Sequence, residues 1–284
     1  MKIPPPCPLP FAEVYRGWGG CIIGDKLARD GGQPREMQDD IYRRMYEVEG
    51  RHWWYSGKRA IIRSLLDRYV AAGAGSGTPR VADLGCGCGR MLEELGGRYE
   101  AVGVDVSQTA IEFCAMRGVK ALLGALPDGV PLEDGTFDAV IMSDILEHVE
   151  DDAGAAKRAG GLLRAGGVMI VTAPAYEGLW SSWDEAHRHK RRYTAGTLRR
   201  ALEGAGLDFE FMSYYNTVLF PAAAAARLAK RLTGRGGTIE MAVPPEWLNS
   251  ALRAVFASER HVLGRAPLPF GLSVVAVLRR PQGR

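Results

Sequence analysis

A glycine-rich turn between an apolar stretch and a helical stretch constrains this 284-residue chain more than any other feature. Residues 81–84 read Val-Ala-Asp-Leu, which is typical of a short buried strand, and residues 85–89 read Gly-Cys-Gly-Cys-Gly. Glycine allows a tight turn and a close approach of a ligand to the backbone, because it has no Cβ. Asp105 follows Gly85 by 20 residues, where a strand-end carboxylate can accept hydrogen bonds from both hydroxyls of a ribose. The spacing therefore predicts a nucleotide-type ligand at the edge of a sheet.

Strand and helix patterns alternate through the middle of the chain. Further apolar strands are expected over residues 101–104, 119–123, 137–142 and 167–172, and helices over 91–95, 107–117 and 151–163. Repeated strand–helix units with continuously apolar strands indicate a parallel sheet that helices cover on both faces. More helices are expected from residue 39, over 57–72 and over 194–205, and more strands over 207–215 and 272–278. We expect an α/β fold: a Rossmann-like, doubly wound, mostly parallel seven-stranded sheet with N-terminal helices.

The two ends of the chain depart from this regular pattern. Residues 1–40 carry four prolines in their first eight positions and several glycines, which predicts an irregular N-terminal extension. Residues 41–284 are expected to form one domain, in which residues 173–193 read as a long loop. Helical patterns over 218–232 and 247–263 predict a helical insertion, residues 217–269, before the last strand. This insertion would cover a substrate pocket or mediate contact between copies of the chain in a homo-oligomer.

The composition argues against several classes of protein. The formal net charge is only +3, which is too weak a field to indicate a nucleic-acid partner. The most apolar stretch, residues 217–229, has 13 residues, whereas a transmembrane helix needs roughly 20, and no signal peptide is visible. The five cysteines match no disulfide or zinc spacing, since Cys86 and Cys88 alone cannot complete a tetrahedral site. We expect a reduced, cytoplasmic protein without a transmembrane segment and without a metal.

The form of the glycine turn decides between two classes of ligand. Dinucleotide-binding turns usually read G-x-G-x-x-G, whereas residues 83–89 read D-x-G-x-G-x-G. This spacing resembles motif I of the class I S-adenosylmethionine-dependent methyltransferases. The resemblance continues in order through residues 102–107, 137–144, 146–149 and 162–167, and it covers about residues 78–173.

The resemblance extends outward to one bacterial subgroup, many members of which act on small or lipid-like molecules. It rests there on residues 52–59, 173–176 and 179–194. One departure concerns the third strand, after which relatives often carry an acid that bonds the adenine amino group. Residues 124–126 read Gly-Ala-Leu and offer only backbone, so Asp128 is the nearby acid that could substitute.

The resemblance implies a cofactor, S-adenosylmethionine, laid across the carboxyl ends of the strands. Asp105 would hold its ribose, and Val106 would line its adenine. Arg59 would pair with its carboxylate, and Trp53 or Tyr55 would cover it, although core packing is an equally good interpretation of Trp53. The glycine turn and the ends of the third and fourth strands complete the expected set of cofactor residues: Asp83, Gly85, Cys86, Gly87, Ala125, Leu126, Ser143 and Asp144.

Methyl transfer requires alignment of a nucleophile and, only where that nucleophile carries a proton, a general base. Glu177 is our first candidate for the base, because it comes soon after the fifth strand. His187 is the second candidate, and Tyr215, at the end of the sixth strand, is another. For each of these side chains the alternative is a structural hydrogen bond.

The basic run from Arg188 to Arg192 has two interpretations. In the first, it anchors the loop by pairing with the acids Asp184 and Glu185. In the second, it binds an anionic substrate such as a prenyl diphosphate through charge-assisted hydrogen bonds. The expected substrate residues are Trp180, Arg191, Arg192 and Tyr214. Mg²⁺ is expected only if the substrate is a diphosphate.

The leading hypothesis is methyl transfer from S-adenosylmethionine to a small-molecule acceptor in bacterial secondary-metabolite biosynthesis, with S-adenosylhomocysteine as the product. One alternative is C-methylation of an anionic prenyl diphosphate with Glu177 as base. Another is a non-catalytic, methyltransferase-like binding subunit. Nucleic-acid methylation ranks last, because residues 143–146 read Ser-Asp-Ile-Leu rather than the Asn-Pro-Pro-aromatic sequence of many base-modifying relatives. The sequence identifies neither the acceptor atom nor the oligomeric state.

Overall fold

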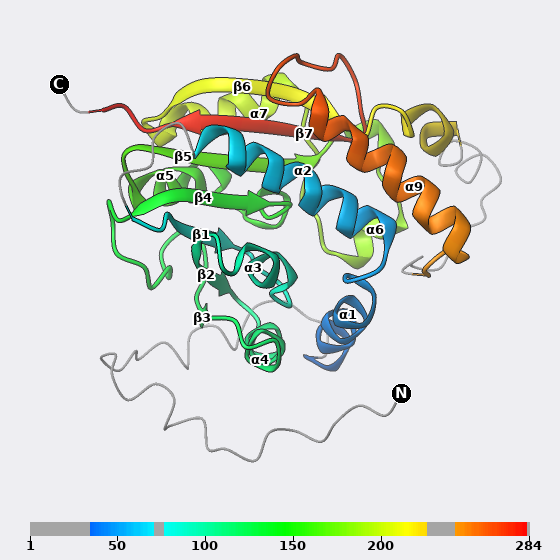
Figure 1. Cartoon of the computed structure of the whole chain (residues 1–284), viewed down its shortest axis with the longest axis horizontal. Coiled ribbons are helices and arrows are strands. Elements are labelled where there is room, and N and C mark those ends of the chain that lie inside the picture. The colour runs from blue at the N-terminus through cyan, green and yellow to red at the C-terminus, as the bar shows by residue number, and fades with distance from the viewer. Residues whose placement is uncertain (1–34, 71–76, 226–241, 283–284) are drawn as a thin grey trace. The chain divides into compact units, whose positions relative to one another are not determined.

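A seven-stranded sheet forms the centre of the computed structural model, which describes residues 35–70, 77–225 and 242–282 (Figure 1). The strand order is β3-β2-β1-β4-β5-β7-β6. The strands are β1 (Arg80–Leu84), β2 (Glu100–Asp105), β3 (Ala121–Leu123), β4 (Phe137–Ser143), β5 (Leu163–Pro174), β6 (Asp208–Tyr215) and β7 (Ser273–Arg279). β7 runs antiparallel to β5 and β6, and the other neighbouring pairs are parallel. The expected mostly parallel sheet of seven strands is confirmed.

Helices connect the strands and cover both faces of the sheet. The α-helices with described bounds are α1 (Arg35–Val48), α2 (Trp53–Tyr69), α3 (Arg90–Leu95), α4 (Gln108–Met116), α5 (Asp152–Leu162), α6 (Ser182–Ala186), α7 (Ala195–Leu202) and α9 (Glu246–Ser258). Short 3₁₀ helices are η2 (Leu146–His148), η3 (Glu177–Leu179), η4 (Glu203–Ala205) and η5 (Glu259–His261). In Figure 1, α2 and α9 cross the near face of the sheet, while α5 and α7 lie behind it.

Alternate residues of the central strands enter two separate apolar cores. Val81 and Ile141 pack with α2 and α9, whereas Ala82 and Val140 pack with α5 and α7. Successive side chains of a strand point to opposite faces, so a strand with continuous apolar character fits a sheet that is covered twice. The chain order reverses between β1 and β4, which makes the carboxyl edge of these strands the topological switch point.

Three local predictions differ from the structure, and a fourth lies partly outside the described residues. Residues 35–40 belong to α1, so the expectation of irregular chain is wrong there, and residues 1–34 lie outside the described part. α2 begins at Trp53 rather than near residue 57, because the His52 side chain accepts a hydrogen bond from the Trp54 amide and caps the helix. The predicted loop 173–193 contains η3 and α6. Of the helix expected over 218–232, residues 220–225 are helical and 226–232 lie outside the described residues.

The chain divides into two compact units, Met1–Gln38 and Asp39–Arg284. The sheet and every side-chain contact discussed below belong to the second unit. Within the described residues, no helix is long and apolar enough to cross a membrane.

Candidate active site

The glycine turn carries β1 into α3 through backbone conformations that suit glycine. Gly85, Gly87 and Gly89 have positive φ angles of 75°, 53° and 80°. A Cβ atom added to Gly85 would lie 2.8 Å from Cδ1 of Ile145, and one added to Gly87 would lie 2.8 Å from Cε of Met45. A side chain larger than hydrogen would therefore fill the space next to this turn and displace its neighbours.

Asp105 ties the glycine turn to the end of β2. One carboxylate oxygen, Oδ2, accepts the Gly87 amide at 2.9 Å. The other, Oδ1, accepts the Ser107 amide at 2.9 Å and the Tyr42 hydroxyl at 3.1 Å. Burial raises the pKa of Asp105, and the hydrogen bonds from the two amides and from Tyr42 oppose this rise. The next residue, Val106, leaves 48% of its surface exposed, which suits a side chain that lines a ligand.

Tyr42 is a contact that the sequence analysis missed. It comes from α1, and its main-chain carbonyl also accepts a hydrogen bond from the Cys88 thiol, with 3.4 Å between Sγ and the oxygen. Tyr42 and Met45 are three residues apart, so both lie on the helix face that packs on the glycine turn and Asp105. The three-residue spacing in the sequence indicates that Tyr42 and Met45 share a helix face. The sequence does not show that this face packs on Asp105.

At the end of β3, the backbone of Ala125 is engaged in a local turn. Its amide donates to the Gly129 carbonyl at 3.2 Å, and its carbonyl accepts the Gly129 amide at 2.8 Å. Leu126 packs partly against the core on the α5 side of the sheet. The Ala125 amide is therefore committed, whereas its carbonyl keeps a second lone pair for an adenine contact. Asp128 in the same turn is exposed.

The end of β4 presents a carboxylate that is held from two sides. Asp144 accepts the Lys58 ammonium on Oδ2 and the Thr172 hydroxyl on Oδ1, both at 2.8 Å. Burial alone would raise the pKa of Asp144, but Lys58 and Thr172 lower it below its usual value. Ser143 lies 3.3 Å from Thr172, oxygen to oxygen. Asp83 is buried nearby on β1, and burial raises its pKa to about 7 although Lys58 acts in the opposite direction.

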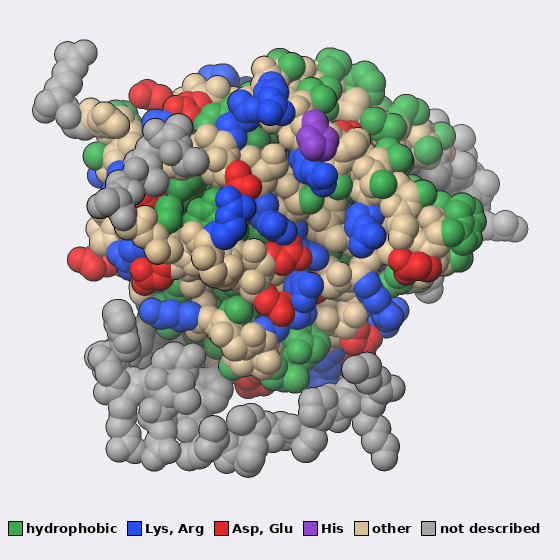
Figure 2. Space-filling view, in the orientation of Figure 1, with side chains coloured by type: hydrophobic (Ala, Val, Ile, Leu, Met, Phe, Trp, Pro, Cys, Tyr) green, Lys and Arg blue, Asp and Glu red, His purple; other side chains and the backbone are tan. Residues whose placement is uncertain are grey.

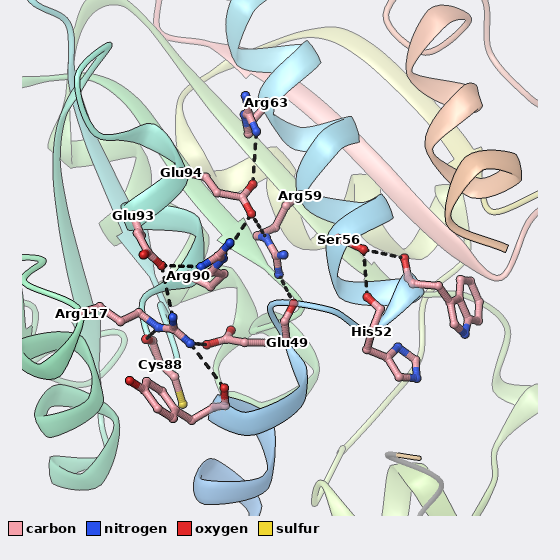
Figure 3. A network of polar contacts seen from close by, with 12 residues as sticks. Glu49, His52, Ser56, Arg59, Arg63, Cys88, Arg90, Glu93, Glu94 and Arg117 are labelled. Atoms are coloured by element: carbon pink, nitrogen blue, oxygen red, sulfur yellow. Dashed lines mark hydrogen bonds and ion pairs between the residues drawn. The ribbon is translucent and has the colours of Figure 1, made fainter. Parts of the chain in front are cut away.

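Arg59 lies in a polar network with Glu49, Arg63 and Glu94 (Figure 3). Its guanidinium donates to Glu94 Oε1 and to the Glu49 carbonyl, both at 2.9 Å. Arg63 reaches the other oxygen of Glu94 at 3.2 Å. The network joins α2, α3 and the segment that follows α1. The bonds to Glu94 and to the Glu49 carbonyl use two of the three Arg59 nitrogens. Its role toward the cofactor carboxylate stays a prediction, and Lys58, one residue earlier, faces Asp144 instead.

Trp53 packs at the contact between α2 and α9. Its ring meets Phe256 edge-on at 5.8 Å between centroids, and its amide donates to Asn249 Oδ1 at 2.9 Å. The geometry favours core packing over a cover on the cofactor. Tyr55 lies edge-on to Trp54, with 4.9 Å between ring centroids.

Within the basic run, Arg192 ties the loop to Asp184 and to the end of β5. The buried Arg192 makes a bidentate ion pair with Asp184, at 2.7 Å and 2.8 Å, and donates to the Ala175 carbonyl at 3.0 Å. Arg191 lies 3.0 Å from Asp152 Oδ2 and also donates to the Glu150 carbonyl at 3.0 Å. The pairing of an arginine with Asp184 is therefore as the first interpretation expects.

The structure spreads the candidate bases over several environments. Glu177 is exposed in η3 and accepts the Arg192 amide at 2.9 Å. His187 stacks on Trp183 with 4.0 Å between centroids, and burial lowers its pKa. Tyr215 is buried, and burial raises its pKa well above its ordinary value. The contacts described for these three side chains are with other residues, so the structure does not bring them together.

The two remaining substrate candidates lie on the loop after β5 and at the end of β6. Tyr214 accepts the Ala195 amide on its hydroxyl at 3.0 Å and stacks on Tyr176. Trp180 ends η3, where its amide donates to the Glu177 carbonyl at 3.0 Å. The cofactor candidates at the ends of β1, β2 and β4, by contrast, share one edge of the sheet.

Comparison with known proteins agrees with this geometry. Residues 82–171 match a family model described as a methyltransferase domain. The chain is 34% identical over 130 residues to an uncharacterized methyltransferase of Mycobacterium bovis, covering 42% of this chain and 64% of that protein. It is 36% identical over 100 residues to a ubiquinone biosynthesis O-methyltransferase of Methylocella silvestris, covering 32% of this chain and 38% of the relative. The crystal structure of the cyclase SpnF shares the fold, with a TM-score of 0.56 and 19% identity over 87% of this chain and 95% of that one.

Residues 82–171 therefore match a methyltransferase domain, and the sheet around them has the fold that the resemblance to the class I S-adenosylmethionine-dependent methyltransferases predicts. The matched residues, 82–171, run from β1 into β5 and contain the glycine turn, Asp105 and Asp144. The chain spans about three-fifths of the length of the first curated relatives that it matches.

Proposed function

We propose that this chain transfers a methyl group from S-adenosylmethionine to a small-molecule acceptor and releases S-adenosylhomocysteine. The observation that carries the proposal is the arrangement of the bare turn at Gly85 and Gly87 beside the Asp105 carboxylate. A turn without Cβ atoms next to a strand-end carboxylate suits a ligand with a ribose. The match of residues 82–171 to a methyltransferase domain supports the same conclusion.

The described residues fit this cofactor in two respects. Asp105 can accept both ribose hydroxyls if it exchanges the Tyr42 hydroxyl for one of them. Asp144 is kept ionised by Lys58 and can accept hydrogen bonds from an ammonium group. When bound, the cofactor supplies a methyl group on a positively charged sulfur. The residues of this chain then contribute by holding the donor and by aligning the acceptor.

For an acceptor that carries a proton, we propose Glu177 as the general base and His187 as the second candidate. Glu177 is exposed to solvent, and its bond to the Arg192 amide fixes one of its two oxygens. The methyl carbon would gain a bond to the acceptor as its bond to sulfur breaks, and the acceptor proton would pass to this carboxylate.

We further propose that the acceptor is a metabolite processed in the cytoplasm, in bacterial secondary metabolism. The similarity to a ubiquinone biosynthesis O-methyltransferase supports a small acceptor. The described cysteines Cys86, Cys88 and Cys114 are free thiols, which supports a reducing compartment. On the face that Figure 2 shows, basic and acidic side chains are interspersed, which argues against a nucleic-acid surface on that face.

Calorimetry with S-adenosylhomocysteine, followed by transfer of labelled methyl to a panel of hydroxylated and aminated small molecules, tests the proposal. We expect saturable binding and label in at least one acceptor. Binding of a nicotinamide dinucleotide together with indifference to S-adenosylhomocysteine would overturn it.

A binding role without methyl transfer is a second candidate, because a protein named for a different activity, the cyclase SpnF, shares this fold. It predicts binding of S-adenosylhomocysteine without methyl transfer to any acceptor of the panel. The two candidates therefore differ in the second measurement and agree in the first.

C-methylation of a prenyl diphosphate is a third candidate, with Mg²⁺ as the ion that would bridge the diphosphate. The ion pairs of Arg191 and Arg192 with Asp152 and Asp184 support the anchor role instead. Under the diphosphate hypothesis, Arg191→Ala raises KM strongly and leaves affinity for S-adenosylhomocysteine intact. An unchanged KM would remove this candidate.

A further inference from the structure

Three side chains from two distant segments converge beside the end of β4. Glu147 and His148 come from η2, and His189 comes from the loop after α6. Each offers one atom able to bind a metal, and these atoms all lie within 4.8 Å of one another. The rings of His148 and His189 stand nearly perpendicular, with centroids 4.7 Å apart.

Glu147 is the unusual member of this cluster. Its exposed fraction is 0%, and neither carboxylate oxygen has a hydrogen-bond partner among the described residues. Lys58 and Arg192 influence it electrostatically, but their hydrogen bonds direct them to Asp144 and Asp184. A buried carboxylate without a bonded partner is costly, because water no longer solvates it.

A chain of polar contacts orients the histidines. Nδ1 of His189 lies 2.8 Å from Oδ1 of the fully buried Asp184, which Arg192 holds in turn. A carboxylate on Nδ1 places the proton there and leaves the lone pair on Nε2. The His148 ring is hydrogen-bonded to the backbone of His187. A carboxylate or a carbonyl behind each imidazole is the arrangement that supports metal-binding histidines.

We propose that Glu147, His148 and His189 bind one divalent first-row transition-metal ion of the zinc or iron(II) type. Two imidazoles and one carboxylate favour such an ion over Mg²⁺ or Ca²⁺, which prefer oxygen ligands alone. The ion gives the orphaned Glu147 oxygens a partner. The cysteine spacing, from which the sequence analysis expected no metal, has no part in this site. The two ligand segments are about 40 positions apart in the sequence, so only the fold brings them together.

The site lies on the same edge of the sheet as the proposed cofactor position. Glu147 follows Asp144 by three residues, and the Lys190 amide donates to the Glu147 carbonyl at 2.7 Å. That bond joins the loop carrying His189 to η2. Metal binding would therefore also fix the loop against the end of β4.

Metal-free full-length protein, prepared with a chelator, is titrated with Zn²⁺ by calorimetry and with Co²⁺ by visible absorption. We expect one equivalent to bind, and Mg²⁺ to bind far more weakly. Asp184→Asn should weaken Zn²⁺ binding about 10–100-fold, because it removes the partner of His189. His148→Ala and His189→Ala should weaken it at least as much. His261→Ala is the matched control, since His261 is exposed in η5 and outside the cluster, and it should bind like the wild type.

Glu147→Gln separates metal binding from burial of a merely protonated acid. The amide has the same shape, so a structural carboxylic acid would tolerate it without loss of zinc affinity. We expect Zn²⁺ to raise the melting temperature of the wild type and of His261→Ala, and not that of Glu147→Gln or His189→Ala. Circular dichroism checks that the variants fold.

Zinc affinity equal in all variants, absence of binding, or Mg²⁺ binding as tight as Zn²⁺ would overturn the proposal. S-adenosylhomocysteine binding is measured separately, so failure of the metal proposal leaves the proposed transfer activity untouched.

Discussion

Asp105 concentrates the contacts of the proposed cofactor site, because donors from three elements meet its two oxygens. These are the Gly87 amide, the Ser107 amide and the Tyr42 hydroxyl. We predict that Asp105→Asn weakens binding of S-adenosylhomocysteine at least about tenfold, since an amide replaces one acceptor with a donor. Isothermal calorimetry measures this loss.

Tyr42→Phe is the informative companion to that variant. If the Tyr42 hydroxyl gives way to a ribose hydroxyl, its removal leaves the affinity for S-adenosylhomocysteine equal or higher. Wild-type affinity in Asp105→Asn, or a large loss in Tyr42→Phe, would contradict this account of the site.

The buried carboxyl group of Asp83 should make the free energy of unfolding depend on pH. Burial raises its pKa from 3.8 to about 7 in the folded protein. The folded state then holds a proton that the unfolded state has released, so the free energy of unfolding falls as pH rises from about 4 to about 7. Such a shift corresponds to about 4 kcal/mol at most. Urea unfolding at several pH values should show this decline in the wild type and a smaller one in Asp83→Asn. Equal slopes in both proteins would disprove it.

The sequence could not decide which of the neighbouring residues Lys58 and Arg59 faces the proposed cofactor site. Both basic residues follow the aromatic residues 53–55, and Arg59 was the predicted cofactor contact. Consecutive helix residues point in different directions, so one meets Asp144 and the other meets Glu94. Which of the two faces the site depends on how α2 lies on the sheet.

At the scale of elements, α2 and α9 meet through a glycine. A Cβ atom at Gly57 would lie 2.5 Å from Cδ1 of Phe256, which itself is buried against Trp53 and Tyr215. We predict that Gly57→Ala lowers the free energy of unfolding by about 1–3 kcal/mol, because the helices must separate. Chemical denaturation measures the change. Gly204→Ala, where nothing lies within 4 Å of the added Cβ, is the control and should stay near wild type.

The structure of the segment between β5 and α7 was predicted only in part from its sequence. Its basic run predicted either an anchor for the loop or a site for an anionic substrate, and in the first case Asp184 was expected to pair with an arginine. The capping box of Ser181 and Asp184, and the turn of helix that it starts, were not expected. The Asp184 carboxylate both caps α6 and forms the ion pair with Arg192. Only the ion pair was predicted from the sequence.

At the scale of the whole molecule, ligand binding should stabilise the fold that forms the site. At a concentration of S-adenosylhomocysteine 100 times its Kd, the free energy of unfolding should rise by about 2.7 kcal/mol. Thermal unfolding with and without ligand measures this, with a nicotinamide dinucleotide as the comparison. We expect no shift with the dinucleotide. A shift with the dinucleotide alone would reverse the choice between the two ligand classes.

The sequence by itself determined the alternating strands and helices, the seven-stranded sheet, and the glycine turn after β1 with Asp105 at the end of β2. These features are local, since periodicity and glycine act over a few residues and parallel strands bring their carboxyl ends to one edge. Only the tertiary structure decided that Tyr42 reaches Asp105, that Lys58 rather than Arg59 reaches Asp144, and that His189 joins Glu147. Such pairs are distant in the chain, and they depend on packing angles that no short stretch of sequence encodes.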